Sequence, residues 1–363
     1  MTLDNAIILG DAIETLRKIP AHTFDFCFAD PPYFMQLEEG KKLIRAGGTE
    51  FSGCDDAWDK FSSMDAYKQW TKAWLSEVRR TLKENGAICV ISGMQSIYEI
   101  GSILRELGFW VINDIIWQKS NPTPNFNGAR LNNSHETIIW AAKSKSSKFT
   151  FNYKTGKYIN LGKQMGSIWT LPVCTGKERL RDEKGIKIHN TQKPEALLHR
   201  IMVLFTKIGD HVLDPFGGTM TTAAVAKRTG RKFTVIEQDA RYIKYGKLRL
   251  ENISPDIGDA ESAVFDIKPV KVSVAEMVAA GYLKIGETFI HRNGEKAILT
   301  DEKGTLKYGK LQASMHEIAA KMMSSNAKRV NAFDYLYVKR ARNKIKLSEV
   351  RDNYRKQLIS QNK

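Results

Sequence analysis

The chain has 363 residues, of which 42% are hydrophobic, and it carries a formal net charge of +16 at pH 7. This length favours one large domain and a smaller second one. No apolar run approaches the length of a bilayer span and no basic leader opens the chain. A soluble, cytoplasmic protein is therefore expected, and not one that spans a membrane or is secreted.

Strands and helices alternate along the first 250 residues, with apolar runs and helical spacings that turn residues separate. The predicted strands are 6–9, 24–29, 87–92, 109–117, 137–142, 211–213 and 232–236. The predicted helices run to Lys18, from Met64 to the Asn85-Gly86 stop, and over 96–107, 194–206, 219–228 and 240–250. This alternation predicts an α/β fold with a doubly wound, mostly parallel sheet.

Three segments depart from the regular pattern. Residues 38–57 are polar and glycine-rich and are predicted to form a mobile loop, and residues 143–190 are basic and irregular. Between the first two of these segments lies the second predicted helix. It carries Tyr67, Trp70 and Trp74 at helical spacing, which favours core packing. Ser62 and Asp65 are expected to cap the start of this helix. Residues 254–268 have the proline, glycine and acidic content of a linker.

The chain beyond that linker predicts a small α+β unit over 269–346, followed by a basic tail over 347–363. Helices are expected at 274–280 and 314–323, with short strands near 288–290, 297–299 and 305–306. A basic run extends from Lys339 to Lys346. It suits a phosphate backbone, although a solvated tail has the same composition.

The tetrad Asp30-Pro31-Pro32-Tyr33 directly follows the second predicted strand. Open α/β sheets bind ligands at the carboxyl ends of their strands. The prolines hold the backbone extended and remove two N–H donors, while the tyrosine offers a flat face with a polar tip. The tetrad therefore predicts a pocket with acceptors for an amino group and a stacking surface for a ring, as on a nucleobase.

A second signal starts at Asp214, where a strand enters a small-residue turn and then a helix. Such a turn lets a ligand approach backbone N–H groups. Glu237, at the end of the next predicted strand, is placed to bind ribose hydroxyls, although an exposed strand-end acid explains it equally well. A nucleotide-binding oxidoreductase is disfavoured, because only Gly10-Asp11, and no G-x-G-x-x-G, follows the first strand.

The chain resembles the β-class amino-specific DNA methyltransferases that use S-adenosylmethionine. Their catalytic motif matches D-P-P-Y at 30–33, and their D-P-F-x-G-x-G-T-T loop matches 214–222. The likeness is closest to the cell-cycle-regulated (CcrM-type) adenine methyltransferases and their restriction-system relatives. It includes W-Q-K-S-N-P at 117–122, P-N-F at 124–126, H-E-T at 135–137, C-T-G at 174–176, T-Q-K-P-E at 191–195 and the C-terminal module.

The resemblance implies a Rossmann-like methyltransferase domain over 1–253 and S-adenosylmethionine as cofactor, with no metal. Asp30, Pro31, Pro32 and Tyr33 would be catalytic, with Asp30 and the Pro31 carbonyl accepting from the target amine. The cofactor site would consist of Asp11, Ala12, Asp30, Thr191, Lys193, Pro194, Asp214, Phe216, Gly217, Gly218, Thr219, Thr221 and Glu237. Met220 and Asn190 depart from the motifs, and Met220 puts a side chain on the cofactor loop.

The expected partner is double-stranded DNA, which the basic charge also favours. A target-recognition segment is expected near 145–190 and a DNA-binding module over 269–346. The candidate DNA contacts are Asn121, Asn125, Lys177, Arg179, Arg181, Lys339, Arg340 and Arg342. The resemblance implies adenine N6 in GANTC, whereas the residues alone do not separate adenine N6 from cytosine N4.

Several alternatives stay open at this point. A catalytically silent DNA-binding protein on the same scaffold, which Met220 favours, and an RNA methyltransferase both fit the motifs. A homodimer and a cognate restriction endonuclease are further partners that the residues leave undecided.

His135, beside Glu136, suits a structural role at a strand start better than acid–base catalysis. The four cysteines, Cys27, Cys54, Cys89 and Cys174, have no metal-binding spacing and are expected to be free thiols.

Overall fold

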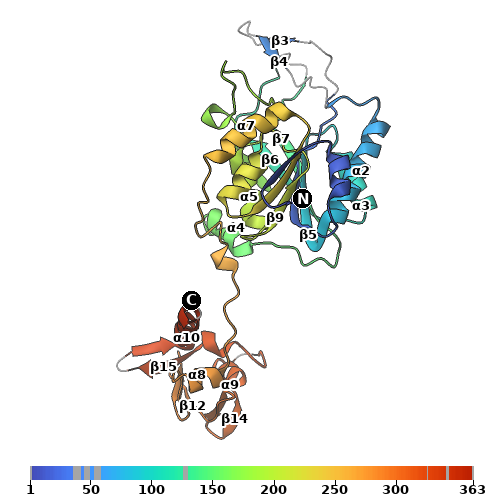
Figure 1. Ribbon diagram of the computed structural model, residues 1–363. Coiled ribbons are helices and arrows are strands. Elements are labelled where there is room, and N and C mark those ends of the chain that lie inside the picture. The colour runs from blue at the N-terminus through green and yellow to red at the C-terminus, as the bar shows by residue number, and fades with distance from the viewer. Residues whose placement is uncertain are drawn as a thin grey trace. The chain divides into compact units, whose positions relative to one another are not determined.

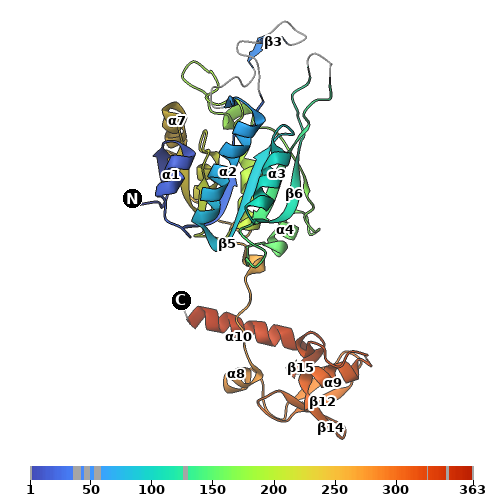
Figure 2. The same ribbon diagram turned by 90° about the vertical axis from the view of Figure 1, so that its right-hand side faces the viewer.

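The computed structural model describes residues 2–35, 42–44, 50–52, 59–125, 130–324, 326–340 and 343–361. The chain divides into two compact units, Met1–Ile267 and Lys268–Lys363. Figures 1 and 2 show the elements of each unit from two directions. The cofactor and catalytic residues predicted from the sequence all belong to the first unit.

An eight-stranded sheet forms the centre of the first unit, in the order β1-β10-β9-β2-β5-β7-β6-β8. Its strands are β1 (Ala6–Leu9), β2 (Phe24–Ala29), β5 (Leu82–Ser92), β6 (Trp110–Lys119), β7 (His135–Ala142), β8 (Ile168–Leu171), β9 (His211–Asp214) and β10 (Lys232–Glu237). All neighbouring strands run parallel except β7, which is antiparallel to both β5 and β6. The predicted α/β class with a mostly parallel sheet is confirmed.

Helices cover both faces of this sheet (Figures 1 and 2). On one side lie α1 (Ala12–Lys18), α2 (Met64–Thr81) and α3 (Ile97–Glu106), whose apolar side chains share a core with β2 and β5. On the other lie α5 (Glu195–Phe205), α6 (Thr221–Arg228) and α7 (Ala240–Glu251). Trp74 of α2 is fully buried in the first core, as its helical spacing predicted.

The ends of α2 differ from the prediction. Ser63, and not Ser62, caps the helix, because its hydroxyl accepts from the N–H of Ala66 at 3.1 Å. The helix ends at Thr81, four residues before the expected Asn85-Gly86 stop. Leu82 is already extended and pairs with Phe24 of β2, so Asn85 and Gly86 lie inside β5. Strand pairing therefore overrides the local turn preference of the Asn-Gly pair.

Two segments without a predicted element contain regular structure. Within residues 38–57, β3 (Lys42–Ile44) and β4 (Glu50–Ser52) form an antiparallel pair, and the rest of that expected loop lies outside the described residues. Within 143–190, α4 (Tyr153–Ile159) precedes β8, which extends the sheet beyond β6. Both strands of the pair and the whole of α4 are short, so their periodicity in the sequence is weak.

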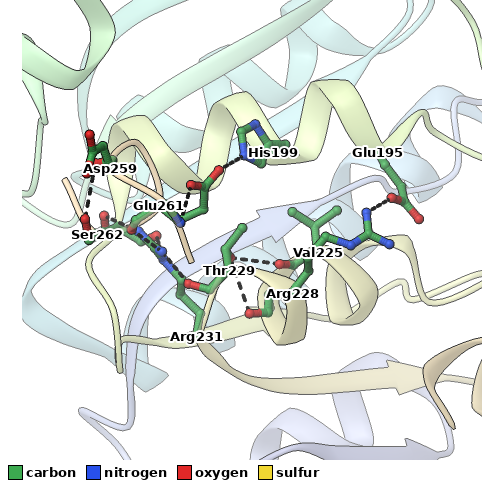
Figure 3. A network of polar contacts seen from close by, with 12 residues as sticks. Glu195, His199, Val225, Arg228, Thr229, Arg231, Asp259, Glu261 and Ser262 are labelled. Atoms are coloured by element: carbon green, nitrogen blue, oxygen red, sulfur yellow. Dashed lines mark hydrogen bonds and ion pairs between the residues drawn. The ribbon is translucent and has the colours of Figure 1, made fainter. Parts of the chain in front are cut away.

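The predicted linker over 254–268 is wrong for most of its length, because residues 254–267 pack on the first unit. Figure 3 shows Glu261 facing His199 of α5, with 2.6 Å between Oε1 and Nε2. The buried Arg231 donates to the carbonyl of Glu261 at 2.6 Å and to the carbonyl of Thr206 at 3.1 Å. Further along, Asp266 accepts from the N–H of Lys154 and of Thr155 in α4. Composition does not separate such a docked loop from a free linker.

The second unit is built on a six-stranded antiparallel sheet in the order β14-β13-β12-β11-β15-β16. Its strands are β11 (Thr288–His291), β12 (Lys296–Leu299), β13 (Thr305–Tyr308), β14 (Leu311–Ser314), β15 (Leu336–Arg340) and β16 (Asn343–Lys346), and its helices are α8 (Val274–Ala279), α9 (Met315–Met322) and α10 (Leu347–Gln361). The predicted basic tail is wrong, since α10 occupies it and buries Leu347, Val350 and Tyr354 in the core of this unit.

Among the described residues, no helix combines the length and apolar character needed to cross a membrane.

Candidate active site

Four strands of the first unit end at the same edge of the sheet. Because β1, β10, β9 and β2 are parallel neighbours, their carboxyl ends bring Asp11, Glu237, Asp214 and Asp30 to one place. A cavity of about 260 Å³ opens there, and all four acids line it. An open α/β sheet binds its ligand at the carboxyl ends of its strands, so this cavity is the candidate ligand site.

The tetrad that follows β2 is fixed by contacts from α2 and from the residue Asp59. The hydroxyl of Tyr67 donates to the carbonyl of Pro32 at 2.9 Å. The Asp59 carboxylate accepts from the N–H groups of Phe34 and Met35 at 2.8 and 2.7 Å. Phe34 lies in the left-handed region with φ 56°, so the chain turns sharply directly after Tyr33. These bonds hold the tetrad in one conformation at the cavity wall.

Lys193 brings two acids of the site together. Its Nζ lies 2.8 Å from Oδ2 of Asp30 and 3.8 Å from Oε2 of Glu136, and it stands 5.0 Å from the centre of the Tyr33 ring. The Tyr33 hydroxyl donates to Oε2 of Glu136 at 2.7 Å. Lys119 completes the group with its Nζ 2.8 Å from Oε1 of Glu136. The catalytic tetrad is thus part of a larger, charged and hydrogen-bonded cluster.

Burial and charge shift the titration of these groups in different directions. Burial raises the pKa of Asp30, and the nearby Lys193 only partly offsets this. Burial also opposes ionisation of Glu136, but Lys193 and Lys119 together hold its pKa below the usual range. Burial and the two carboxylates keep the pKa of Tyr33 well above that of a free phenol. Tyr33 therefore stays neutral and serves as a hydrogen-bond donor and a ring surface.

The turn after β9 is held by the acid that opens it. Asp214 accepts from the N–H of Phe216 at 2.9 Å and from the hydroxyl of Thr222. A side chain at Gly217 would come within 2.1 Å of Val235, so only glycine fits there. The N–H of Gly218 points to Glu237 and donates to Oε2 at 2.7 Å. The turn therefore presents its backbone to the cavity and is tied to the acid at the end of β10.

Met220 does not obstruct this turn. Its side chain is fully buried in the cluster that α6 and α7 form with β10, and it is absent from the cavity lining. Gly246 of α7 makes room, because a Cβ there would lie 2.2 Å from Cγ of Met220. Met220 adopts a left-handed conformation with φ 61°, and this turns its side chain into the core. The side chain of Met220 therefore does not enter the cofactor cavity.

The far wall of the cavity comes from the segment before α5. His189, Thr191, Gln192 and Lys193 line it. Nδ1 of His189 accepts from the N–H of Thr191 at 3.1 Å, and burial lowers the pKa of this histidine to about 4. His189 is therefore a neutral wall residue at physiological pH.

The structure brings together nearly all the predicted catalytic and cofactor residues. All four catalytic candidates and every cofactor candidate except Pro194 line the cavity, while Pro194 directly precedes α5 at its N-cap position. Sequence reasoning missed Glu136, which was considered only as the neighbour of His135. It also missed the wall residues Trp70, His189 and Tyr242. The H-E-T motif could have indicated Glu136, but the resemblance was not used to assign that motif a role in the site.

The cavity fits S-adenosylmethionine on the evidence of its own residues. Glu237 offers carboxylate oxygens for ribose hydroxyls, and burial raises its pKa although three N–H groups point to it. Gly217 and Gly218 leave space for a close approach to the backbone, and Phe216 and Trp70 supply apolar surface. In the described part of the chain there is no cluster of three or more side chains suited to a metal ion.

The candidate DNA contacts in the first unit lie outside the cavity lining. Asn121 accepts from the N–H of Val173, far along the chain, and Asn125 donates to the carbonyl of the nearby Arg130. Arg179 makes four hydrogen bonds to the carbonyls of Cys174, His189 and Asn190, so it is a structural clamp with most of its donors occupied. Lys177 is exposed, and Arg181 donates to the carbonyl of Gly185 at 2.6 Å.

In the second unit, the described residues of the basic run lie at the end of β15 and in β16, which pair as an antiparallel β15–β16 hairpin. Lys339 is exposed and lies directly opposite Lys344. Arg340 forms an ion pair with Glu287 and donates to the carbonyl of Tyr282, so it supports the fold of this unit. Arg342 lies outside the described residues.

Comparisons with known proteins identify the family of this chain. Residues 24–248 match the N6/N4 family of DNA methylases. The chain is 46% identical over 353 residues to the type II methyltransferase M.HinfI of Haemophilus influenzae, covering 97% of each protein. It is 41% identical over 249 residues to the type II methyltransferase M2.LlaDCHI of Lactococcus lactis subsp. cremoris, covering 68% of this chain and 90% of the relative.

Solved structures show the same fold. The complex of M1.HpyAVI with S-adenosylmethionine matches 68% of this chain and 98% of its own, with 26% identity and a TM-score of 0.50. The cytosine-N4-specific PvuII DNA methyltransferase matches 71% of this chain and 89% of its own, with 19% identity and a TM-score of 0.52, which is a likeness of fold alone. The family match and the similarity to M.HinfI across nearly the whole chain show that this protein belongs to the N6/N4 DNA methyltransferases, which use S-adenosylmethionine.

Proposed function

We propose that this enzyme methylates the N6 amino group of adenine in double-stranded DNA, within the sequence GANTC. The observation that carries the proposal is the position of Asp30 beside the Pro31-Pro32-Tyr33 turn in the wall of the cofactor cavity. The choice of adenine and GANTC rests on the resemblance of the ordered motifs to the cell-cycle-regulated methyltransferases. The likeness to M.HinfI over 97% of the chain supports a type II specificity.

The reaction requires a better nucleophile than an ordinary base amino group. The lone pair of that nitrogen is delocalised into the ring, so it attacks poorly. Asp30 and the carbonyl of Pro31 would accept its two N–H groups, which favours a geometry in which the lone pair is released. Asp30 must be ionised to accept, and its position relative to the cavity would orient the nitrogen.

S-adenosylmethionine supplies a methyl group that the sulfonium charge activates. We assign its ribose hydroxyls to Glu237 and its adenine to Asp11 and Ala12. The methionine side would lie along Phe216, Gly218, Thr219 and Thr221, with Thr191 and Lys193 at the opposite wall. Asp214 and Pro194 would act indirectly, by holding the glycine turn and the start of α5.

The target adenine must leave the duplex, because the cavity cannot be reached by a stacked base. Tyr33 would receive the ring. Its hydroxyl is fixed by Glu136, so the plane of the ring is defined before the base arrives. Aromatic stacking on a base contributes about 1–3 kcal/mol, which offsets part of the cost of unstacking.

Affinity for DNA would come from basic residues outside the cavity. We assign the segment 145–190 to target recognition, with Lys177 and Arg181 as candidate contacts. The β15–β16 hairpin places Lys339 opposite Lys344, and like charges in such a pair destabilise the hairpin unless a polyanion binds. This observation supports a role of residues 269–346 in binding the phosphate backbone.

Incubation with duplex oligonucleotides and S-adenosylmethionine, followed by nucleoside mass spectrometry, tests the proposal. N6-methyladenine is expected in a duplex with one GANTC site and not in a duplex with that site scrambled. The Asp30→Ala variant is expected to bind the duplex but to transfer no methyl group. N4-methylcytosine as the product, activity only on RNA, or full activity of Asp30→Ala would each refute it. The silent-protein alternative rested on Met220, whose buried position no longer supports it.

A further inference from the structure

Four charged side chains of alternating sign form a continuous chain at the active site. Lys119 contacts Glu136 at 2.8 Å, Glu136 faces Lys193 at 3.8 Å, and Lys193 contacts Asp30 at 2.8 Å. Their side chains are 14%, 13%, 6% and 19% exposed in that order. Two of the four, Glu136 and Lys119, do not line the cavity. Their position calls for an explanation beyond cofactor contact.

The direction of β7 explains why Glu136 reaches the active site. Because β7 is antiparallel to β5, its first residues lie at the edge where the parallel strands end. Glu136 pairs in register with Trp117 of β6, and Lys119 follows two residues later on that strand. Two adjacent antiparallel strands therefore deliver an acid and a base to the catalytic edge, opposite the segment that carries Lys193.

Burial makes this arrangement necessary. An ammonium group as enclosed as that of Lys193 is costly unless anionic groups surround it. Asp30 supplies one anion, but Asp30 must also be available to the target amine. Glu136 supplies the second, and Lys119 balances the charge of Glu136. Glu136 also fixes the hydroxyl of Tyr33, so one carboxylate holds both neighbours of the catalytic acid.

We propose that Glu136 and Lys119 are positioning residues for methyl transfer, which together hold Lys193 and Tyr33 and set the charge that Asp30 experiences. Neither touches the reacting atoms. The inference rests on the proposed role of Asp30 as acceptor of the target amino group. In the resting enzyme Lys193 occupies that acceptor, and Glu136 is the anion that remains with Lys193 when the amine binds.

The proposal makes opposite predictions for the two residues. Lys193, Glu136, Tyr33 and, at the end of β9, Asp214 are the titratable groups that face Asp30. Without the charge of Glu136, Asp30 is the only one of the two carboxylates that pairs with Lys193. The pKa of Asp30 then falls, and the acid limb of the activity profile moves to lower pH. Removing Lys119 leaves the charge of Glu136 unbalanced, so the pKa of Asp30 rises and the limb moves to higher pH.

The test measures kcat/KM for methyl transfer to a GANTC duplex between pH 5 and 9, in the full-length enzyme. Glu136→Gln keeps the size and hydrogen bonding of the side chain, and Lys119→Met keeps its apolar stem. Shifts of about half a pH unit to one unit in opposite directions are expected. The double variant should return the limb towards that of the wild type, because the two effects oppose each other.

The exposed pair Lys68–Glu99 between α2 and α3 provides matched controls. Lys68→Met and Glu99→Gln make the same charge changes away from the cavity and should leave the profile unchanged. Affinity for S-adenosylmethionine, measured by calorimetry, should stay within about threefold in all variants, since Glu136 and Lys119 do not line the cavity.

Loss of activity in Glu136→Gln and Lys119→Met with no shift, or with shifts in the same direction, would show a packing role and overturn the inference. Activity and pH limb unchanged in Glu136→Gln would also overturn it. A wild-type enzyme that transfers no methyl group to adenine would instead refute the proposed function, so the two failures are distinguishable.

Discussion

Met220 and Gly246 are complementary in shape: a Cβ on Gly246 would lie 2.2 Å from Cγ and 3.0 Å from Cβ of Met220. The methionine stands at the turn that leads from the cofactor cavity into α6, and the glycine lies in α7. Because Gly246 has no side chain, α7 approaches the turn closely. The contact with α7 in the core then fixes the position of the turn. The unusual residue on the cofactor loop is therefore paired with a small residue on the next helix.

Gly246→Ala should destabilise the first unit. The added methyl group has no space beside Met220, and overpacking of this kind costs about 1–3 kcal/mol. Met220→Ala in the same chain should recover a large part of that loss, which urea unfolding would measure. Gly166→Ala is the control, because a Cβ there meets nothing within 4 Å. Equal stability of Gly246→Ala and the wild type would contradict the contact.

Met220→Gly should leave cofactor affinity nearly unchanged while it lowers stability. The side chain lies in the core and not in the cavity, so its removal creates a void that costs about 2–4 kcal/mol. Relief of the left-handed methionine backbone returns about 1–2 kcal/mol of that cost. Calorimetry should give a Kd for S-adenosylmethionine within about twofold of the wild type. A tenfold change would place Met220 at the cofactor after all.

Asp214 should make stability depend on pH in a defined window. Burial raises its pKa from an ordinary value of 3.8 to about 7, against the opposing hydrogen bonds from Thr222 and Phe216. The folded protein therefore binds a proton that the unfolded chain has lost between these values, so stability falls as pH rises towards 7. Above about pH 7 both states are ionised and this contribution becomes constant.

Comparison with Asp214→Asn isolates this effect. The stability of the wild type relative to the variant should fall from pH 5 to pH 7 and stay level from pH 7.5 to pH 9, as followed by urea unfolding. The constant offset reports the changed hydrogen bonds, whereas the slope reports only the proton. A relative stability that rises with pH would show that Asp214 is ionised more easily in the folded protein than in the unfolded chain.

The parts of the fold that the sequence predicted are those with local signals. The runs that form β2, β9 and β10 are apolar and end in an acid, and the parallel order of these strands then brings the acids together. The end of α2 was missed because pairing of Leu82 with Phe24 is a long-range contact. Short elements such as α4 carry too few turns to produce a clear periodicity.

The missed site residues share a different cause. Glu136 is the second residue of the antiparallel strand β7, and the rule that ligands bind at carboxyl ends of strands does not find it. Residues 254–267 have the composition of a linker, yet Arg231 and Asp266 anchor them to the first unit through backbone groups. Hydrogen bonds to the backbone leave almost no signature in residue type. The helix α10 was missed for another reason, because its few buried apolar residues are set among many charged ones.

Lys339 and Lys344 should contribute to DNA affinity through charge alone. The double variant Lys339→Ala/Lys344→Ala should weaken binding of any duplex, with or without GANTC, and reduce the slope of log K against log salt by up to about 2. Fluorescence anisotropy at several salt concentrations measures this. The variant should fold at least as stably as the wild type, since a pair of like charges is removed. An unchanged salt slope would exclude the hairpin from the interface.

Arg231 should control how firmly residues 254–267 are attached to the first unit. Arg231 is 3% exposed. Its side chain donates to the carbonyls of Thr229 and Glu261 (Figure 3), and also to the hydroxyl of Thr206. Burial lowers the pKa of Arg231 to about 10, so it stays charged at neutral pH. Arg231→Met removes these donors and leaves buried carbonyl groups without them. A loss of about 2–4 kcal/mol is expected in urea unfolding.

The same variant should release the docked segment before the unit unfolds. Limited proteolysis in native buffer should cut Arg231→Met within residues 254–267 at conditions where the wild type resists, because the carbonyl of Glu261 loses its anchor. Lys72→Met is the control, since it removes a cation from the exposed pair with Glu106 and should change neither property. Cleavage of both variants at the wild-type rate would show that His199 and Asp266 hold the segment without Arg231.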